Sequence, residues 1–264
     1  MYRLIVAALF ALCFLPSLSS AVDIKNIRPC HGPLGAYRSD KICLPGDFYF
    51  MTYDLEGLVL DKTGKASYVT TLELLDSTGK VLFKKETPND VVPQLGGTRM
   101  PGDLHVIMGT KQAPGEYAIK LTVYDKLGKD AKAFTQKFQV VPETFGFVGA
   151  SAAAVGFPGQ QYVTGFGLVN MTLNAKKQPD AEVTIRILDD TGKAVGPPVQ
   201  ILMPRDMPEN TDLEKGNFVP LSYPVFLNRA GRYMIDVQAN DKIGKKNAKL
   251  SFQITVIDIS SVTK

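Results

Sequence analysis

One stretch of this chain occurs twice, and the repetition limits what the chain can fold into. Residues 115–129 and 231–245 align without a gap at an offset of 116, and residues 71–80 and 184–193 align at an offset of 113. The three additional residues must lie between Lys193 and Gly231, where the second copy is rich in proline and acidic residues. A repeating unit of about 115 residues is the size of one domain, so the sequence predicts a tandem duplication and not a solenoid.

Apolar side chains fall at every second position within the repeats. The odd-numbered residues of 117–123 and of 233–239 are all apolar, and the residues between them are more polar. A period of two predicts strands that place one face on a core and the other in water. We find no convincing amphipathic helix, so the pattern predicts an all-β protein.

The turns between these strands repeat as well. The sequence Asp-x-x-Gly-Lys begins at Asp61, Asp76, Asp125, Asp189 and Asp241. The aspartate can accept hydrogen bonds from backbone N–H groups further along the turn, and the glycine adopts positive φ without steric strain. Because the first glycine of a phosphate-binding loop is absent, the motif predicts hairpins and not nucleotide binding.

The first residues have the features of a secretory signal peptide. A short start containing Arg3 is followed by the 12-residue apolar run 4–15 and by the small residues Ser19 and Ala21. The run is too short to span a bilayer, which needs about 20 apolar residues. We expect cleavage of residues 1–21 and a secreted or periplasmic protein that does not insert into the membrane. A buried N-terminal helix is the alternative.

Two cysteines remain after such cleavage, Cys30 and Cys43. An even number of cysteines in an exported protein favours a disulfide, so we expect a Cys30–Cys43 bond. A metal site formed by Cys30, His31 and Cys43 is the less favoured alternative, because a structural zinc site needs four well-spaced ligands.

Short alternating strands, Asp-Gly turns and the strand starts Pro-Gly-x-Tyr and Ala-Gly-x-Tyr resemble the immunoglobulin-like β-sandwich superfamily, in particular fibronectin type III and macroglobulin-type domains. The resemblance covers residues ~27 to ~258 and implies two tandem antiparallel sandwiches, at 22–142 and 143–264. It also implies that Tyr117 and Tyr233 form tyrosine corners. The chain has no tryptophan and no cysteines spaced to join two sheets, which distinguishes it from antibody domains.

Composition and motifs argue against several function classes. The net charge is only +4, and the lysines are dispersed among acidic residues, so we expect no nucleic-acid binding. The two histidines, His31 and His105, lie in different segments and outside any recognised catalytic motif. We therefore expect a protein that is not an enzyme.

Binding residues on β-sandwiches usually lie in loops, so the long irregular segments are the candidate binding sites. Segment 86–103 contains Arg99, and segment 203–220 contains Asp206, Glu209, Asp212 and Glu214. The second segment has enough oxygen ligands for calcium but lacks the order of an EF-hand, so a solvated loop without a cofactor is favoured.

Phe48 and Phe50 form a further apolar feature that is specific to the first repeat. They lie on the face opposite Tyr49 and could contact the second domain, a partner or a neighbouring strand; the neighbouring strand is favoured.

These observations predict an exported, non-catalytic binding or structural protein that presents two sandwiches to a protein or cell-envelope partner. A carbohydrate-binding module is the first alternative, and it predicts an exposed platform of aromatic rings. A secreted enzyme such as a glycoside hydrolase is the second, and it predicts a cleft with paired carboxylates.

Overall fold

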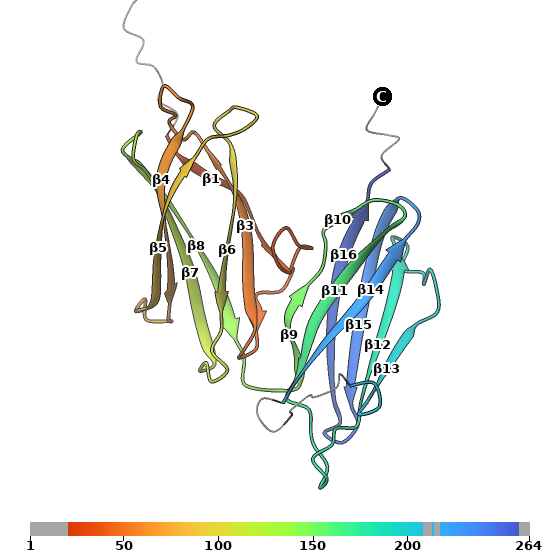
Figure 1. The fold of residues 1–264 in the computed structure, drawn as a ribbon. Coiled ribbons are helices and arrows are strands. Elements are labelled where there is room, and N and C mark those ends of the chain that lie inside the picture. Colours follow the sequence, from red (N-terminus) through yellow and green to blue (C-terminus); the bar gives the residue numbers. More distant parts are fainter. Residues whose placement is uncertain (1–20, 208–212, 214–216, 259–264) are drawn as a thin grey trace, which may run out of the picture.

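The computed structural model describes residues 21–207, 213 and 217–258, and the elements in them are strands (Figure 1). They form two tandem β-sandwiches, each built from a three-stranded and a five-stranded sheet, which confirms the predicted fold class. The predicted signal peptide lies, except for Ala21, outside the described residues and stays a prediction.

The first sandwich contains eight strands. Its sheets have the orders β1-β3-β6 and β2-β8-β7-β4-β5. The strands are β1 (Asp23–Cys30), β2 (Ile42–Cys43), β3 (Phe48–Glu56), β4 (Ala66–Leu75), β5 (Val81–Val91), β6 (Met100–Ile107), β7 (Gly115–Asp125) and β8 (Asp130–Val140).

The second sandwich repeats this topology strand for strand. Its sheets have the orders β9-β11-β14 and β10-β16-β15-β12-β13. The strands are β9 (Gly146–Ser151), β10 (Val155–Gly156), β11 (Gln160–Val169), β12 (Ala181–Asp189), β13 (Val199–Met203), β14 (Phe218–Leu227), β15 (Gly231–Asp241) and β16 (Lys246–Val256).

The topology is immunoglobulin-like. Strands β1, β3 and β6 correspond to A, B and E of that fold, and β4, β7 and β8 correspond to C, F and G, with β5 in the place of C′. The Tyr117 hydroxyl donates a hydrogen bond to the carbonyl oxygen of Ala113 at 2.8 Å, and the Tyr233 hydroxyl donates one to Arg229 at 3.1 Å. These bonds to upstream backbone are those that a tyrosine corner makes.

Strand pairing refines the difference in length between the two copies. Tyr49 and its counterpart Tyr162 are 113 residues apart in the sequence. Their partners on the neighbouring strands, Val106 and Val225, are 119 residues apart. The separation then falls to 116 at Tyr117 and its equivalent in β15. The second copy therefore has an insertion before β14, which a shorter turn after β14 partly offsets.

The aspartates of the repeated turns have two different environments. Asp61, Asp76 and Asp189 lie at the surface, and each accepts hydrogen bonds from the N–H groups two and four residues later. Asp125 and Asp241 are only 1% exposed. The same turn sequence therefore occurs both in surface hairpins and in hairpins whose aspartate is buried.

The two buried aspartates fasten the β7–β8 and β15–β16 hairpins to a distant loop. Asp125 accepts hydrogen bonds from two N–H groups of its own turn at Oδ1, and from the Val59 N–H at Oδ2, at 2.8 Å. Asp241 makes the equivalent bond to the Thr172 N–H at 2.9 Å. Burial alone would raise the pKa of Asp241, but its hydrogen-bond donors outweigh burial and lower it.

The segment that joins β1 to β2 packs against the second sandwich (Figure 1). Ala36 lies in the hydrophobic core of the second domain, and its N–H donates to the Ala152 carbonyl at 2.8 Å. The Ala152 N–H in turn donates to the His31 carbonyl at 3.2 Å. The first domain therefore contributes a piece of backbone to the second.

A buried ion pair holds this segment in place. Asp47 accepts hydrogen bonds from Arg38 Nη2 at 2.9 Å and from the Gly149 N–H of the second domain at 2.9 Å. Arg38 also donates to Asp40 Oδ1 at 2.9 Å and to the backbone carbonyls of Phe48 and Ile42. Both charges are compensated, as buried charges must be.

Phe48 and Phe50 have different neighbours. A Cβ added at Gly149 would lie 3.6 Å from the Phe48 ring, so Phe48 belongs to the domain junction. Phe50 packs on the His105 ring of the neighbouring strand β6, with 4.9 Å between centroids. The favoured expectation, cover by a neighbouring strand, therefore describes Phe50, and Phe48 follows the alternative of a domain contact.

The predicted Cys30–Cys43 disulfide is wrong for this structure, in which both cysteines are free and buried. Cys30 ends β1 of the three-stranded sheet, where it pairs with Phe50, whereas Cys43 lies in β2 of the five-stranded sheet, where it pairs with Val140. The even number of cysteines does not reveal that they belong to different sheets. Burial raises the pKa of Cys43 to about 12 and also raises that of Cys30, so both remain thiols near neutral pH.

His31 is buried at the same junction, with 4% of its surface exposed. Its ring meets Phe252 of β16 edge-on, with 5.0 Å between centroids, and Nδ1 has no hydrogen-bond partner among the described residues. Burial, assisted by the charge of Arg38, lowers the pKa of His31 to about 4. The imidazole is therefore neutral at pH 7. Within the described residues, no group of three or more His, Cys, Asp or Glu side chains could hold a metal ion.

The two kinds of turn aspartate predict different losses of stability. Asp125→Ala leaves three N–H groups without an acceptor, so we expect the free energy of unfolding to fall by about 3 kcal/mol. Asp76→Ala, in the same motif at the surface, is the matched control and is expected to cost less than about 1 kcal/mol. Urea denaturation measures both, and equal losses would contradict the anchoring role.

His31 predicts a loss of stability on acidification. Between about pH 6.5 and pH 4 the unfolded chain binds a proton at His31 and the folded chain does not, so stability rises with pH across this window. Over the whole window, the contribution of His31 to the free energy of unfolding changes by about 3 kcal/mol. We expect the stability of His31→Gln to depend less on pH across this window. His105→Gln, at an exposed position, should keep the pH dependence of the wild type. Unfolding curves at pH 7 and pH 4.5 measure the difference, and parallel behaviour of wild type and His31→Gln would refute it.

Candidate binding groove

The two sandwiches differ on the side where the last strands of the two sheets lie. In the first domain these strands are β5 and β6, and in the second they are β13 and β14. Strand β5 has 11 residues, whereas β13 has 5. The duplication therefore offers an internal comparison between two versions of the same edge.

Pairing registers identify the equivalent positions on the two edges. Leu72 pairs with Lys85, and its counterpart Ile185 pairs with Val199, so Lys85 takes the place of Val199. The same reasoning matches Thr87 with Ile201 and Asn89 with Met203. The apolar set of the second domain packs on its hydrophobic core. The polar set of the first domain leaves a larger space than the hollow of about 300 Å³ that remains beside Val199 in the second domain.

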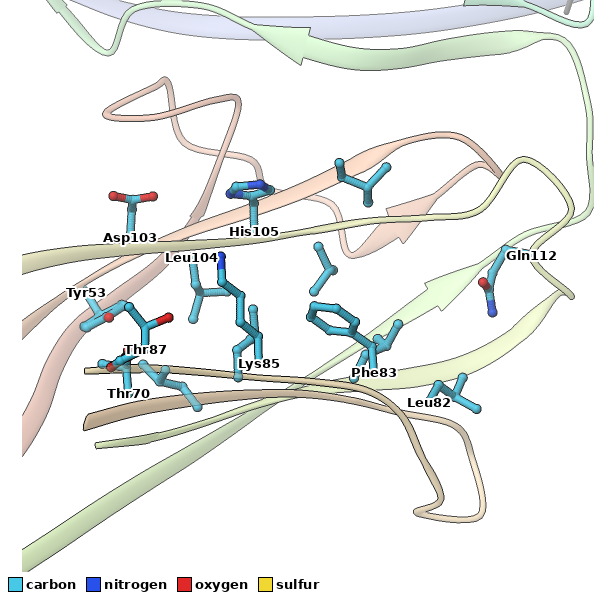
Figure 2. A pocket seen from close by; sticks show the side chains of 15 residues that line it. Tyr53, Thr70, Leu82, Phe83, Lys85, Thr87, Asp103, Leu104, His105 and Gln112 are labelled. Carbon is cyan, nitrogen blue, oxygen red and sulfur yellow. Dashed lines mark hydrogen bonds between the residues drawn. The ribbon is translucent and has the colours of Figure 1, made fainter. Parts of the chain in front are cut away.

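This space is a groove of about 580 Å³ between the two sheets of the first domain (Figure 2). Its volume is within the range of ligand sites. Figure 2 shows the Phe83 ring and the Lys85 side chain rising from β5 into the groove. The residues that line it are Leu72, Leu74, Leu104, Val106 and Leu121, which are buried or half-buried; Leu82, Phe83 and Ile107 at the rim; and Tyr53, Thr70, Lys85, Thr87, Asp103, His105 and Gln112, which are polar.

The rim of the groove exposes large apolar side chains. Leu82 is 45% exposed, Phe83 47% and Ile107 62%. Exposed apolar residues that adjoin an apolar depression are characteristic of interaction sites, whereas scattered ones are not.

Strand β5 also offers backbone groups for pairing. It is the last strand of its sheet and has no hydrogen-bonded strand on its outer side within the described part of the chain. The edge of the second domain is short and is bounded by Pro197, Pro198 and Pro204, which cannot donate backbone hydrogen bonds. Strand β5 contains only Pro88, and its pairing with β4 has a bulge at Leu82, so residues 83–87 form a regular edge.

Lys85 is an unpaired cation in the groove. Its neighbour Lys84 forms an ion pair with Glu86 at 2.8 Å, and Lys120 forms one with Glu73 at 3.2 Å. Lys85 makes no ion pair with any residue that the structure describes. Lys85 is exposed and is therefore available to a carboxylate from outside the described residues.

The loop residues expected to bind a ligand are engaged elsewhere or lie outside the described residues. Arg99 pairs with Asp54 at 2.6 Å. Asp206 accepts hydrogen bonds from the Arg205 side chain at 2.8 and 2.9 Å and from the Leu202 N–H at 2.7 Å, which lower its pKa to about 2.

Glu209, Asp212 and Glu214 lie outside the described residues, so calcium binding by segment 203–220 stays a prediction. The groove was not predicted from the sequence. The available signal was the replacement of Val199 and Ile201 by Lys85 and Thr87, which becomes visible once the edge strands are aligned.

Comparisons with known proteins give no family. No protein-family model and no curated protein matches the chain. Part of the chain (46%) is similar to 31% of the alkylpurine DNA glycosylase AlkC of Pseudomonas fluorescens, at 12% identity and a TM-score of 0.32. Latent PorU of Porphyromonas gingivalis is similar at 15% identity and a TM-score of 0.38, over 91% of this chain and 20% of PorU.

The C-terminal domain of the antigen I/II polypeptide BspA of Streptococcus agalactiae is similar over 89% of this chain and 100% of that domain, at 9% identity and a TM-score of 0.32. Likenesses this low indicate nothing about function. Among the described residues, there is no helix with the length and apolar character needed to cross a membrane.

If the groove is a binding site and not part of the core, its rim should contribute little to stability. We expect Phe83→Ala to lower the free energy of unfolding by less than about 1 kcal/mol, because the ring is half exposed. Phe138→Ala is the matched control and should cost about 3–5 kcal/mol, because its ring is buried and stacked on Tyr49 at 4.9 Å. Chemical denaturation compares the two, and a loss at Phe83 as large as that at Phe138 would contradict the assignment.

Proposed function

We propose that the protein is an exported, non-catalytic binding protein and that the β5–β6 groove of its first sandwich binds an extended segment of a protein or cell-envelope partner. The observation that supports this most is the difference between the copies. The second domain fills much of the space with Val199, Ile201 and Met203 and retains a hollow of about 300 Å³, whereas the first has a groove of about 580 Å³ with a lysine in the place of Val199.

An extended polypeptide suits this site because the site combines an unpaired strand edge with an adjacent apolar groove. A strand added to β5 would gain backbone hydrogen bonds along residues 83–87. Every second side chain of the added strand would then enter the groove. A compact ligand would use the groove and leave the edge unpaired.

The second sandwich is proposed to act as a fixed support. The buried Arg38–Asp47 pair and the Gly149 N–H bond join the domains on the side of the first sandwich where β1 and β2 lie, away from the β5–β6 edge. The signal-peptide features of residues 1–21 support export to a secreted or periplasmic location.

The two alternative functions have less support. Phe48, Phe50 and His105 form a line of rings, but Phe48 and Phe50 are inclined at 81° and do not make the flat platform on which a sugar would stack. For an enzyme, His31 is buried against Phe252 and His105 packs on Phe50, so neither has the exposed pairing with a nucleophile that general-base catalysis requires.

The proposal predicts selection of extended peptides by the groove. Displayed random peptides of about nine residues, long enough to form a strand, should be enriched on the wild-type protein. Binding of the enriched peptides should fall about tenfold or more with Phe83→Glu, which places a charge in the apolar rim. Val163→Glu, at a position 61% exposed on β11 of the second domain, is the control and should bind normally. No enrichment, or enriched peptides that bind Phe83→Glu equally well, would refute the proposal.

A further inference from the structure

We infer that the segment bound by the groove carries an acidic side chain two residues from an apolar one, and that the acidic side chain faces Lys85. This inference rests on the proposed function and adds the chemistry of the partner to it.

The spacing follows from strand geometry. Phe83, Lys85 and Thr87 lie at every second position of β5 and all line the groove. Residues directly opposite one another on neighbouring strands share a face of the sheet and interact as cross-strand pairs. An added strand therefore places one side chain opposite Phe83 and the side chain two residues along opposite Lys85. The first of these positions favours an apolar residue and the second an acidic one.

The charge of the site points to a carboxylate. Lys84 and Lys120, on the same sheet, have acidic partners within the protein, and Lys85 has none among the described residues. Asp103, on the opposite rim, does not offset this preference. It belongs to the other sheet and forms no ion pair with Lys85. Figure 2 shows Asp103 and His105 on the opposite side of β6 from Leu104, which points into the groove.

A second copy of the chain does not supply this carboxylate through its own edge. The residues of β5 that share a face with Lys85 are Phe83, Thr87, Asn89 and Val91, and none is acidic. Two β5 strands paired about Lys85 would place like charges opposite each other, which is unfavourable. The partner is therefore a different polypeptide segment.

The test uses two synthetic peptides of about nine residues, built from alternating threonine and valine with phenylalanine at the fourth position. One has glutamate at the sixth position and the other has lysine. Fluorescence anisotropy with the full chain should show the glutamate peptide binding about fivefold more tightly. Lys85→Glu should reverse the preference. Lys84→Glu, on the other face of β5, should preserve it. The urea-denaturation midpoints of both variants should match that of the wild type.

A third peptide separates this inference from the proposed function. It is the glutamate peptide with N-methyl groups on alternate backbone nitrogens, which cannot donate hydrogen bonds to a strand edge. Its binding should be lost. If both unmodified peptides bind equally and Phe83→Glu abolishes binding, the groove binds extended segments and the acidic requirement is wrong. If no peptide binds, or the N-methylated peptide binds as well as its parent, strand addition fails and the inference fails with it.

Discussion

The arrangement of the two sandwiches depends on the hydrogen bonds that the Asp47 carboxylate accepts. It accepts hydrogen bonds from Arg38, from the backbone of Phe48 and from Gly149, and so joins the β1–β2 segment, the first sandwich and the second sandwich at one point. A buried ion pair adds little net stability, since desolvation offsets much of its attraction, but loss of one partner leaves an uncompensated charge. The pair therefore fixes the geometry of the junction more than it stabilises the fold.

That geometry decides which edges of the first sandwich are free. Strands β1 and β2 end their sheets on one side, and the segment between them is occupied by contacts with the second domain. Strands β5 and β6 end the sheets on the other side, where no described segment covers them. At the same edge the second sandwich has a short strand bounded by prolines, and its apolar residues pack on the core and narrow the space between the sheets. The same edge is therefore exposed in the first domain, at β5, and better protected in the second, at β13.

The sequence predicts the features that local pattern encodes, and it misses those that depend on how segments meet. The alternation in 117–123 and 233–239 indicates which side chains face a core, and the Asp-x-x-Gly-Lys turns indicate where strands reverse. The two-sandwich architecture could therefore be predicted from the sequence. The pattern does not report that Asp125 is buried and Asp76 is not, because that difference arises from the Val59 N–H on a loop far away in the sequence. The disulfide prediction failed for the same reason: spacing does not show that Cys30 and Cys43 pair with strands of different sheets.

Lys85 connects the stability of the exposed edge with its selectivity. A long unpaired edge invites pairing with any strand, including β5 of a neighbouring molecule, and proteins limit this by placing charges on edge strands. A lysine that points into the groove opposes self-pairing, because its counterpart would carry the same charge, and it opposes apolar or basic segments, which would leave the ammonium group unpaired or repelled. An acidic segment alone turns the same charge into an attraction. Since discrimination between partners is a difference between two binding free energies, one residue that penalises most partners and favours one class is sufficient to provide it. The second domain has Val199 at this position and therefore no such charge, and it limits pairing with a short edge strand that prolines bound.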